Sequence, residues 1–68
     1  MKVIIDLKEE HKSEQKQVND LLKENEVLKV RVIEMKEKRH LISVLSVYFK
    51  DKNLNIPIRN IELMWVEK

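Results

Sequence analysis

The 68-residue chain contains no cysteine, no glycine, no alanine and no threonine, and its single proline is Pro57. Without cysteine there is no disulfide framework, and the two isolated histidines lack the spacing of a zinc site. Glycine is the residue that most easily adopts positive φ, so we expect no phosphate-cradling loop, no tight hairpin and no glycine-terminated helix. These absences exclude nucleotide-binding motifs and predict that the protein holds no metal and no other cofactor.

The small size of the chain limits what it does alone. At 8.2 kDa it forms one unit, residues 1–68, and a chain of this length buries only about 60% of the surface that its unfolded form exposes. We therefore expect no enzyme and identify no catalytic residues. Small proteins without disulfides or metals are commonly stabilised by association with other chains.

Basic and acidic residues are interspersed along the chain, 14 against 12, for a net charge of +2. The basic residues Lys36, Lys38, Arg39 and His40 form the one cluster, and they are the weak candidates for contact with nucleic acid. Because acidic residues interrupt this cluster, we interpret it as a solvated helix face.

No apolar segment is long enough to enter a membrane as a helix. The longest apolar-rich run, residues 41–49, covers less than half of the roughly 20 residues that a bilayer-spanning helix needs. We expect no membrane partner. The expected location is the cytoplasm of the cell or of a host cell, or a virion. The richness in lysine, asparagine and isoleucine without alanine hints at an AT-rich genome, such as that of a phage, a virus or a low-GC bacterium.

One long helix is predicted from about residue 7 to about residue 50. Asp6 followed by Glu9 has the pattern of a capping box, and no glycine or proline follows before Asp51. A helix of this length would extend to nearly 70 Å at ~1.5 Å per residue, so it needs a partner along its length. Reading it in heptads gives a dimer seam at Val18, Leu21, Asn25, Leu28, Val32, Met35, Ile42 and Phe49.

The run VNDLLKENEVLKVRVIEM, residues 18–35, resembles the leucine-zipper segment of basic-region leucine-zipper transcription factors. The resemblance implies a parallel dimer in which Asn25 fixes the register. The DNA-reading half of that family has no counterpart here, because residues 1–17 carry no cluster of positive charge. Val27, Val30 and Ile33 fall outside the seam, and a two-stranded coiled coil does not explain them.

A turn is predicted at residues 52–56, ahead of Pro57, followed by a short helix over residues 58–65. A pair of strands is the alternative, because apolar residues alternate on either side of Arg59 and Asn60. The predicted fold is thus all-α, with a coiled-coil stalk at 7–40 and a helical hairpin head at 41–68. The residues expected to pack the head, or to contact a partner, are Leu41, Leu45, Tyr48, Ile61, Met64 and Trp65.

These patterns predict a non-enzymatic, homodimeric coiled-coil module for oligomerisation and protein interaction. Its expected partners are a second copy of itself and another protein, with nucleic acid less favoured. Two alternatives stay open: a small dimeric nucleic-acid-binding regulator, and the oligomerisation segment of a longer protein.

Overall fold

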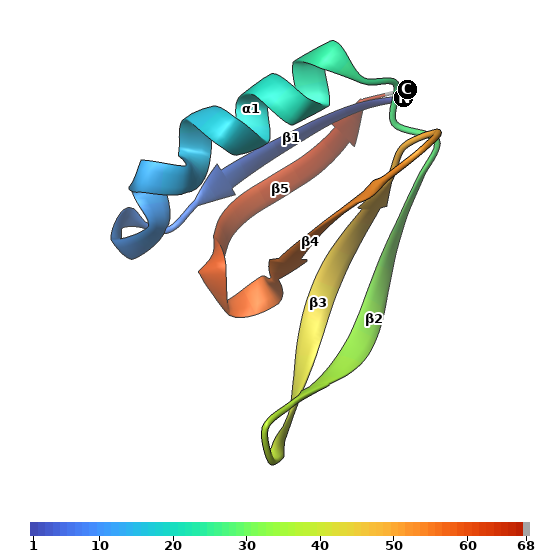
Figure 1. Cartoon of the computed structure of the whole chain (residues 1–68). Coiled ribbons are helices and arrows are strands. Elements are labelled where there is room, and N and C mark those ends of the chain that lie inside the picture. Colours follow the sequence, from blue (N-terminus) through green and yellow to red (C-terminus); the bar gives the residue numbers. More distant parts are fainter. Residues whose placement is uncertain (68) are drawn as a thin grey trace.

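The computed structural model describes residues 1–67 and folds them into two antiparallel sheets and one α-helix (Figure 1). One sheet pairs β1 with β5, and the other has the strand order β2-β3-β4. The helix α1 lies along β1, and a short 3-10 turn, η2, carries the chain from β4 to β5. In chain order the elements are β1 (Lys2–Leu7), the 3-10 segment η1 (Glu9–Glu14), α1 (Gln15–Glu24), β2 (Lys29–Glu37), β3 (His40–Tyr48), β4 (Asn53–Pro57), η2 (Ile58–Asn60) and β5 (Ile61–Glu67).

The all-α prediction is wrong. The long coiled-coil helix, the leucine-zipper dimer that the resemblance implied, the stalk at 7–40 and the helical head at 41–68 are all absent from the described residues. The main helical stretch runs only from Glu9 to Glu24, and the second half of the expected zipper forms β2. Asp6 lies in β1, and Lys8 takes the N-cap position without a side-chain cap, so the capping box is also wrong.

The helix ends at Asn25, the residue expected to fix the zipper register. Its backbone is extended, with φ of −128° and ψ of 143°. Its backbone N–H and its side-chain Nδ2 both donate to the carbonyl oxygen of Leu21, at 3.2 and 3.0 Å. Asn25 therefore satisfies a carbonyl at the helix end. Beyond it, the β-branched Val30, Val32 and Ile33 favour an extended backbone.

The apolar-rich run at residues 41–49 contains the central strand β3, which pairs with β2 on one side and β4 on the other. Val44, Leu45, Ser46 and Val47 are each at most 2% exposed. A strand that is covered on both faces needs apolar residues at successive positions, which explains the run without a helix. The buried hydroxyl of Ser46 donates to Asn55 Oδ1 at 2.7 Å.

The expectation that a chain without glycine forms no tight hairpin is also wrong. Glu37 pairs with His40, so Lys38 and Arg39 alone connect β2 to β3. Lys38 adopts a φ of 55°, a left-handed conformation that costs a residue with a Cβ on the order of 1 kcal/mol. The nine residue pairs between β2 and β3 hold the turn in this conformation.

The C-terminal stretch consists of strands, so the helix predicted over 58–65 is wrong and the alternation of apolar residues was the correct signal. The two strands do not pair with each other as a hairpin would: β4 pairs with β3, and β5 pairs with β1. The turn predicted at 52–56 lies earlier, where the N–H of Phe49 donates to the carbonyl of Lys52 at 2.9 Å.

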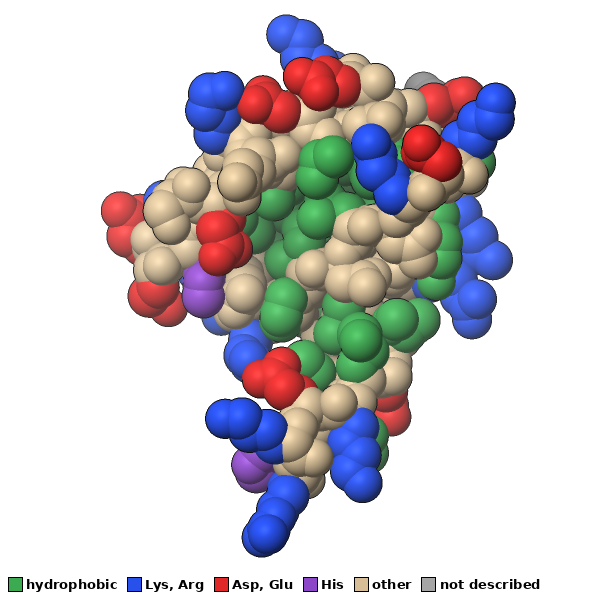
Figure 2. Space-filling view, in the orientation of Figure 1, with side chains coloured by type: hydrophobic (Ala, Val, Ile, Leu, Met, Phe, Trp, Pro, Cys, Tyr) green, Lys and Arg blue, Asp and Glu red, His purple; other side chains and the backbone are tan. Residues whose placement is uncertain are grey.

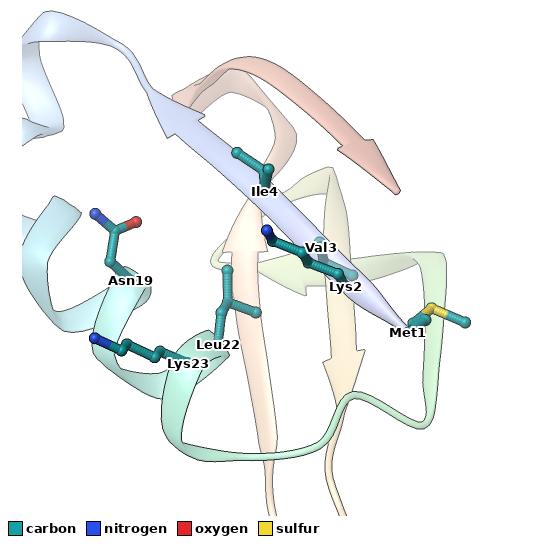
Figure 3. A pocket seen from close by; sticks show the side chains of 7 residues that line it. All are labelled: Met1, Lys2, Val3, Ile4, Asn19, Leu22 and Lys23. Atoms are coloured by element: carbon teal, nitrogen blue, oxygen red, sulfur yellow. The ribbon is translucent and has the colours of Figure 1, made fainter. Parts of the chain in front are cut away.

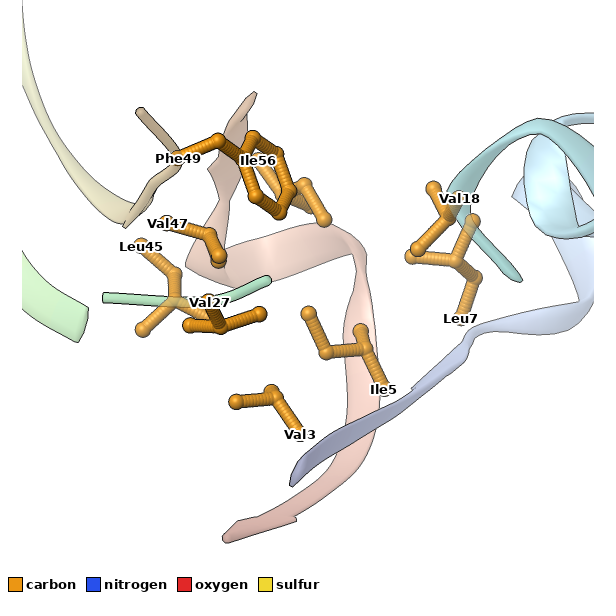
Figure 4. Close-up of a cluster of buried hydrophobic side chains, with 9 residues drawn as sticks. All are labelled: Val3, Ile5, Leu7, Val18, Val27, Leu45, Val47, Phe49 and Ile56. Atoms are coloured by element: carbon orange, nitrogen blue, oxygen red, sulfur yellow. The ribbon is translucent and has the colours of Figure 1, made fainter. Parts of the chain in front are cut away.

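A single cluster of apolar side chains joins the two sheets and the helix (Figure 4). Alternate residues of β1 face this core. Burial of each such side chain stabilises the fold by about 1.5–3 kcal/mol relative to leaving it exposed. The buried members are Val3, Ile5, Leu7, Val18, Val27, Leu45, Val47, Phe49 and Ile56.

Gln15 at the start of α1 covers the free edge of β1. Its Nε2 donates to the carbonyl of Ile5 at 2.7 Å, and the N–H of Leu7 donates to its Oε1 at 2.8 Å. One side chain thus bonds two backbone groups that a neighbouring strand would otherwise bond. Because Ile5 and Leu7 are each 1% exposed, water has little access to replace these bonds.

We predict that Lys38→Gly raises the free energy of unfolding by up to about 1 kcal/mol, because glycine adopts positive φ without steric cost. Urea denaturation measures this change. Arg39→Gly is the control, since its φ is not positive and the glycine adds only freedom to the unfolded chain. A loss of stability in Lys38→Gly would contradict the left-handed turn.

Removing the bonds at the edge of β1 should destabilise the fold. We predict that Gln15→Ala lowers the free energy of unfolding by about 1–3 kcal/mol, because it leaves a buried N–H and a buried C=O without partners. Gln17→Ala, at an exposed position of the same helix, should change it by less than about 0.5 kcal/mol. Equal effects of the two substitutions in the same assay would argue against this role of Gln15.

Candidate functional site

A hollow lies between β1 and the second half of α1 (Figure 3). It is a groove of about 520 Å³. Its only polar side chains belong to two lysines and to Asn19, whose Oδ1 already accepts from Gln15 Nε2 at 3.0 Å. No carboxylate, hydroxyl or imidazole is among its lining side chains, which are mostly apolar. Its lining residues are Met1, Lys2, Val3, Ile4, Asn19, Leu22 and Lys23.

The titratable side chains of residues 1–67 form no reactive cluster. No three His, Asp or Glu side chains lie close enough together in this part of the chain to hold a metal ion. The pKa of Lys16 is raised, because its ammonium donates to Asp20 Oδ2 at 3.0 Å on the open surface of α1 and is attracted by that carboxylate. Within the same range, no helix is both long and apolar enough to cross a membrane.

The most prominent surface is the hairpin, residues 29–48, which extends away from the core (Figure 1). Its first strand, β2, lies at the edge of its sheet and is paired only with β3. Three large apolar side chains of the hairpin are exposed to water: Val32 is 62% exposed, Met35 42% and Leu41 70%. An exposed strand edge beside apolar side chains is typical of a surface that binds another chain.

The positive charge of the protein is concentrated on this hairpin. The hairpin has five basic and two acidic side chains, for a net charge of +3, whereas the rest of the chain has nine basic and ten acidic side chains. Figure 2 shows basic side chains gathered around the end of the hairpin. The charged residues of the hairpin are Lys29, Arg31, Glu34, Lys36, Glu37, Lys38 and Arg39.

The structure brings Lys36, Lys38, Arg39 and His40 together at the tip of the hairpin, and all four are exposed. The interpretation of this cluster as a face of a helix is wrong, because a two-residue turn between strands lies in its centre. The cluster itself was visible in the sequence. Its projection from the fold was not, because it depends on the pairing of β2 with β3.

The residues predicted to form the heptad seam and the head do not share a common surface in the structure. They lie in different environments. Three are buried in the core, six are half-buried, and five are exposed on the hairpin, near its base or on β5. In that order they are Val18, Leu45 and Phe49; Leu21, Asn25, Ile42, Tyr48, Ile61 and Met64; and Leu28, Val32, Met35, Leu41 and Trp65.

A second apolar patch lies on the outer face of the β1–β5 sheet. Trp65 pairs with Ile4 on this face and is 41% exposed, and Leu63 on the same face is 53% exposed. The charges beside this patch are of both signs, because the acidic Asp6 and the basic Lys2 flank it.

The residues that make β2 a candidate interface were not predicted from the sequence. Lys29, Ile33 and Glu37 lie in β2 at equal spacings, four residues apart. The available signal was the misfit of Val30 and Ile33 to the heptad seam, since β-branched residues outside a seam are better placed in a strand.

Comparison with protein-family models, with curated proteins and with solved structures finds no match to this chain.

Proposed function

We propose that the protein is a non-enzymatic interaction module that forms a homodimer by pairing the free edges of two β2 strands. The observation that carries the proposal is the open edge of β2, a nine-residue strand paired on one side only. Such an edge presents unpaired N–H and C=O groups that serve as a template for another strand. At ~3.3 Å per residue, this edge is about 30 Å long.

The charge pattern of β2 favours a second copy as the partner. In an antiparallel pairing centred on Ile33, Lys29 of each copy lies opposite Glu37 of the other, and Ile33 faces its counterpart. Each cross-strand pair of opposite charges contributes about 0.2–1 kcal/mol, and the two-fold symmetry provides two such pairs.

Three neighbouring registers bring like charges together, and the shift by one residue toward the base loses both Lys29–Glu37 pairs. A shift of the centre by half a residue, toward the base or toward the tip, places Lys29 opposite Lys36 or Lys38 of the other copy. It also places the core-facing sides of the two sheets on opposite faces of the combined sheet. A shift by one residue toward the tip places Glu34 opposite itself. The pairing centred on Ile33 avoids these like-charge contacts.

The exposed apolar side chains support the same interface. Val32 and Met35 lie in β2 itself, and their exposed surface is reduced when a second β2 strand lies alongside. A small domain gains stability from such burial, because its own core is limited. An intracellular location belongs to the same proposal, since a chain without cysteine has no disulfide to stabilise it outside the cell.

The test is the mass of the protein in solution, measured by sedimentation equilibrium. We expect a mass of twice 8.2 kDa for the unmodified chain. Lys29→Glu should shift the mass toward that of the monomer, because the introduced carboxylate would then face Glu37 of the other copy. The double variant Lys29→Glu/Glu37→Lys should restore the dimer, since it exchanges the two charges without removing the pair.

Lys52→Glu is the matched control, because it makes the same charge change at an exposed position in the turn before β4. It should leave the dimer intact. A monomer mass for the unmodified chain would overturn the proposal and would favour a different protein as the partner of β2. Equal dissociation of the Lys29→Glu and Lys52→Glu variants would overturn the proposed register.

A further inference from the structure

The basic side chains at the hairpin tip lack acidic partners within residues 1–67. Four basic side chains of the described residues have an acidic partner within 4 Å, namely Lys2, Lys12, Lys16 and Arg59. Lys36, Lys38 and Arg39 are among those that have none, and all three are exposed at the same end of the hairpin.

The acidic residue nearest the turn, Glu37, has a basic neighbour outside the tip. Glu37 Oε1 lies 3.8 Å from the guanidinium Nη2 of Arg59, which follows β4 in η2. This contact partly balances the negative charge of Glu37 and leaves the three basic residues of the tip available to an external anion.

The hairpin places its basic side chains at one exposed end. It ends in a turn of only two residues, which keeps Lys38 and Arg39 next to each other beyond the last strand pair (Figure 1). Lysine and arginine side chains at such an exposed end are suited to contacts with the phosphates of DNA.

The proposed dimer fixes the distance between its two tips. With Ile33 on the two-fold axis, about 11 residue steps separate the two turns, which is roughly 36 Å at ~3.3 Å per residue. One helical turn of B-DNA spans about 34–36 Å, which is the spacing at which dimeric proteins contact two successive half-sites.

We propose that the two hairpin tips of the dimer bind double-stranded DNA through its phosphates, one helical turn apart. This inference rests on the homodimer proposed above. Lys36, Lys38 and Arg39 of each copy supply six phosphate contacts, so binding weakens steeply as salt displaces the protein from the phosphates. The logarithm of affinity should fall against the logarithm of salt concentration with a slope of about −5.

The test measures the affinity for a duplex of about 24 base pairs by fluorescence anisotropy between about 50 and 200 mM salt. We expect Lys38→Gln/Arg39→Gln to reduce the slope by about 3–4, because it removes four of the six contacts. Its affinity at the lowest salt should fall at least about tenfold. The control Lys50→Gln/Lys52→Gln removes the same charge at the exposed turn before β4 and should leave most of the binding intact.

Glu37→Lys separates the contribution of the dimer from that of the charge. It adds positive charge at the tip but places two lysines opposite each other in the β2 pairing. Affinity for the 24-base-pair duplex should therefore fall, while affinity for a duplex of about 10 base pairs, too short to reach both tips, should not. A rise in affinity for the longer duplex would overturn the two-tip arrangement.

Two other results would overturn the inference and leave the homodimer in place. One is a dimeric mass without DNA binding at the lowest salt, and the other is equal binding of poly-glutamate and DNA, which would indicate an acidic protein instead. A monomeric mass would overturn the homodimer and with it the spacing, whatever the DNA result.

Discussion

Burial of the central strand β3 is the constraint on which the rest of the structure depends. Its residues Val44–Val47 are covered on both faces and lie between β2 and β4. The core side chains of β1 and α1 cover one of those faces, and β5 completes the sheet that carries β1. Because the first part of β3 extends past this core, its outer half and its partner β2 form a hairpin that the core does not cover. The exposed edge and the exposed tip both follow from that arrangement.

The sequence alone predicted one helix from about residue 7 to about residue 50, and the structure keeps only its part from Glu9 to Glu24. Lysine and glutamate give residues 29–37 the composition of a helix, while Val30, Val32 and Ile33 favour a strand. The pairing partners that decide between the two lie at residues 40–48, and no local pattern encodes that contact. Helical spacing and strand alternation also coincide at the C-terminus, where pairing with β1 selects the strand.

The candidate site could be foreseen as a list of residues but not as a surface. The basic cluster was evident, yet its position depends on Lys38 accepting a left-handed backbone that composition alone argued against. Lys29 and Glu37 can be identified as a possible cross-strand ion pair only when the strand that contains them is known to lie at a sheet edge. In the proposed dimer one strand has two roles, because the edge that would pair two copies also sets the separation of their basic tips.

The most direct test of the edge pairing uses the absence of cysteine from the chain. In the proposed dimer Ile33 faces its counterpart, and facing residues have Cα atoms about 4.5–5.5 Å apart, within reach of a disulfide. Ile33→Cys should therefore yield a covalent dimer on oxidation. Arg31→Cys should yield little, because its two copies lie four residue steps, about 13 Å, apart. Equal cross-linking at both positions, or none at position 33, would contradict the account.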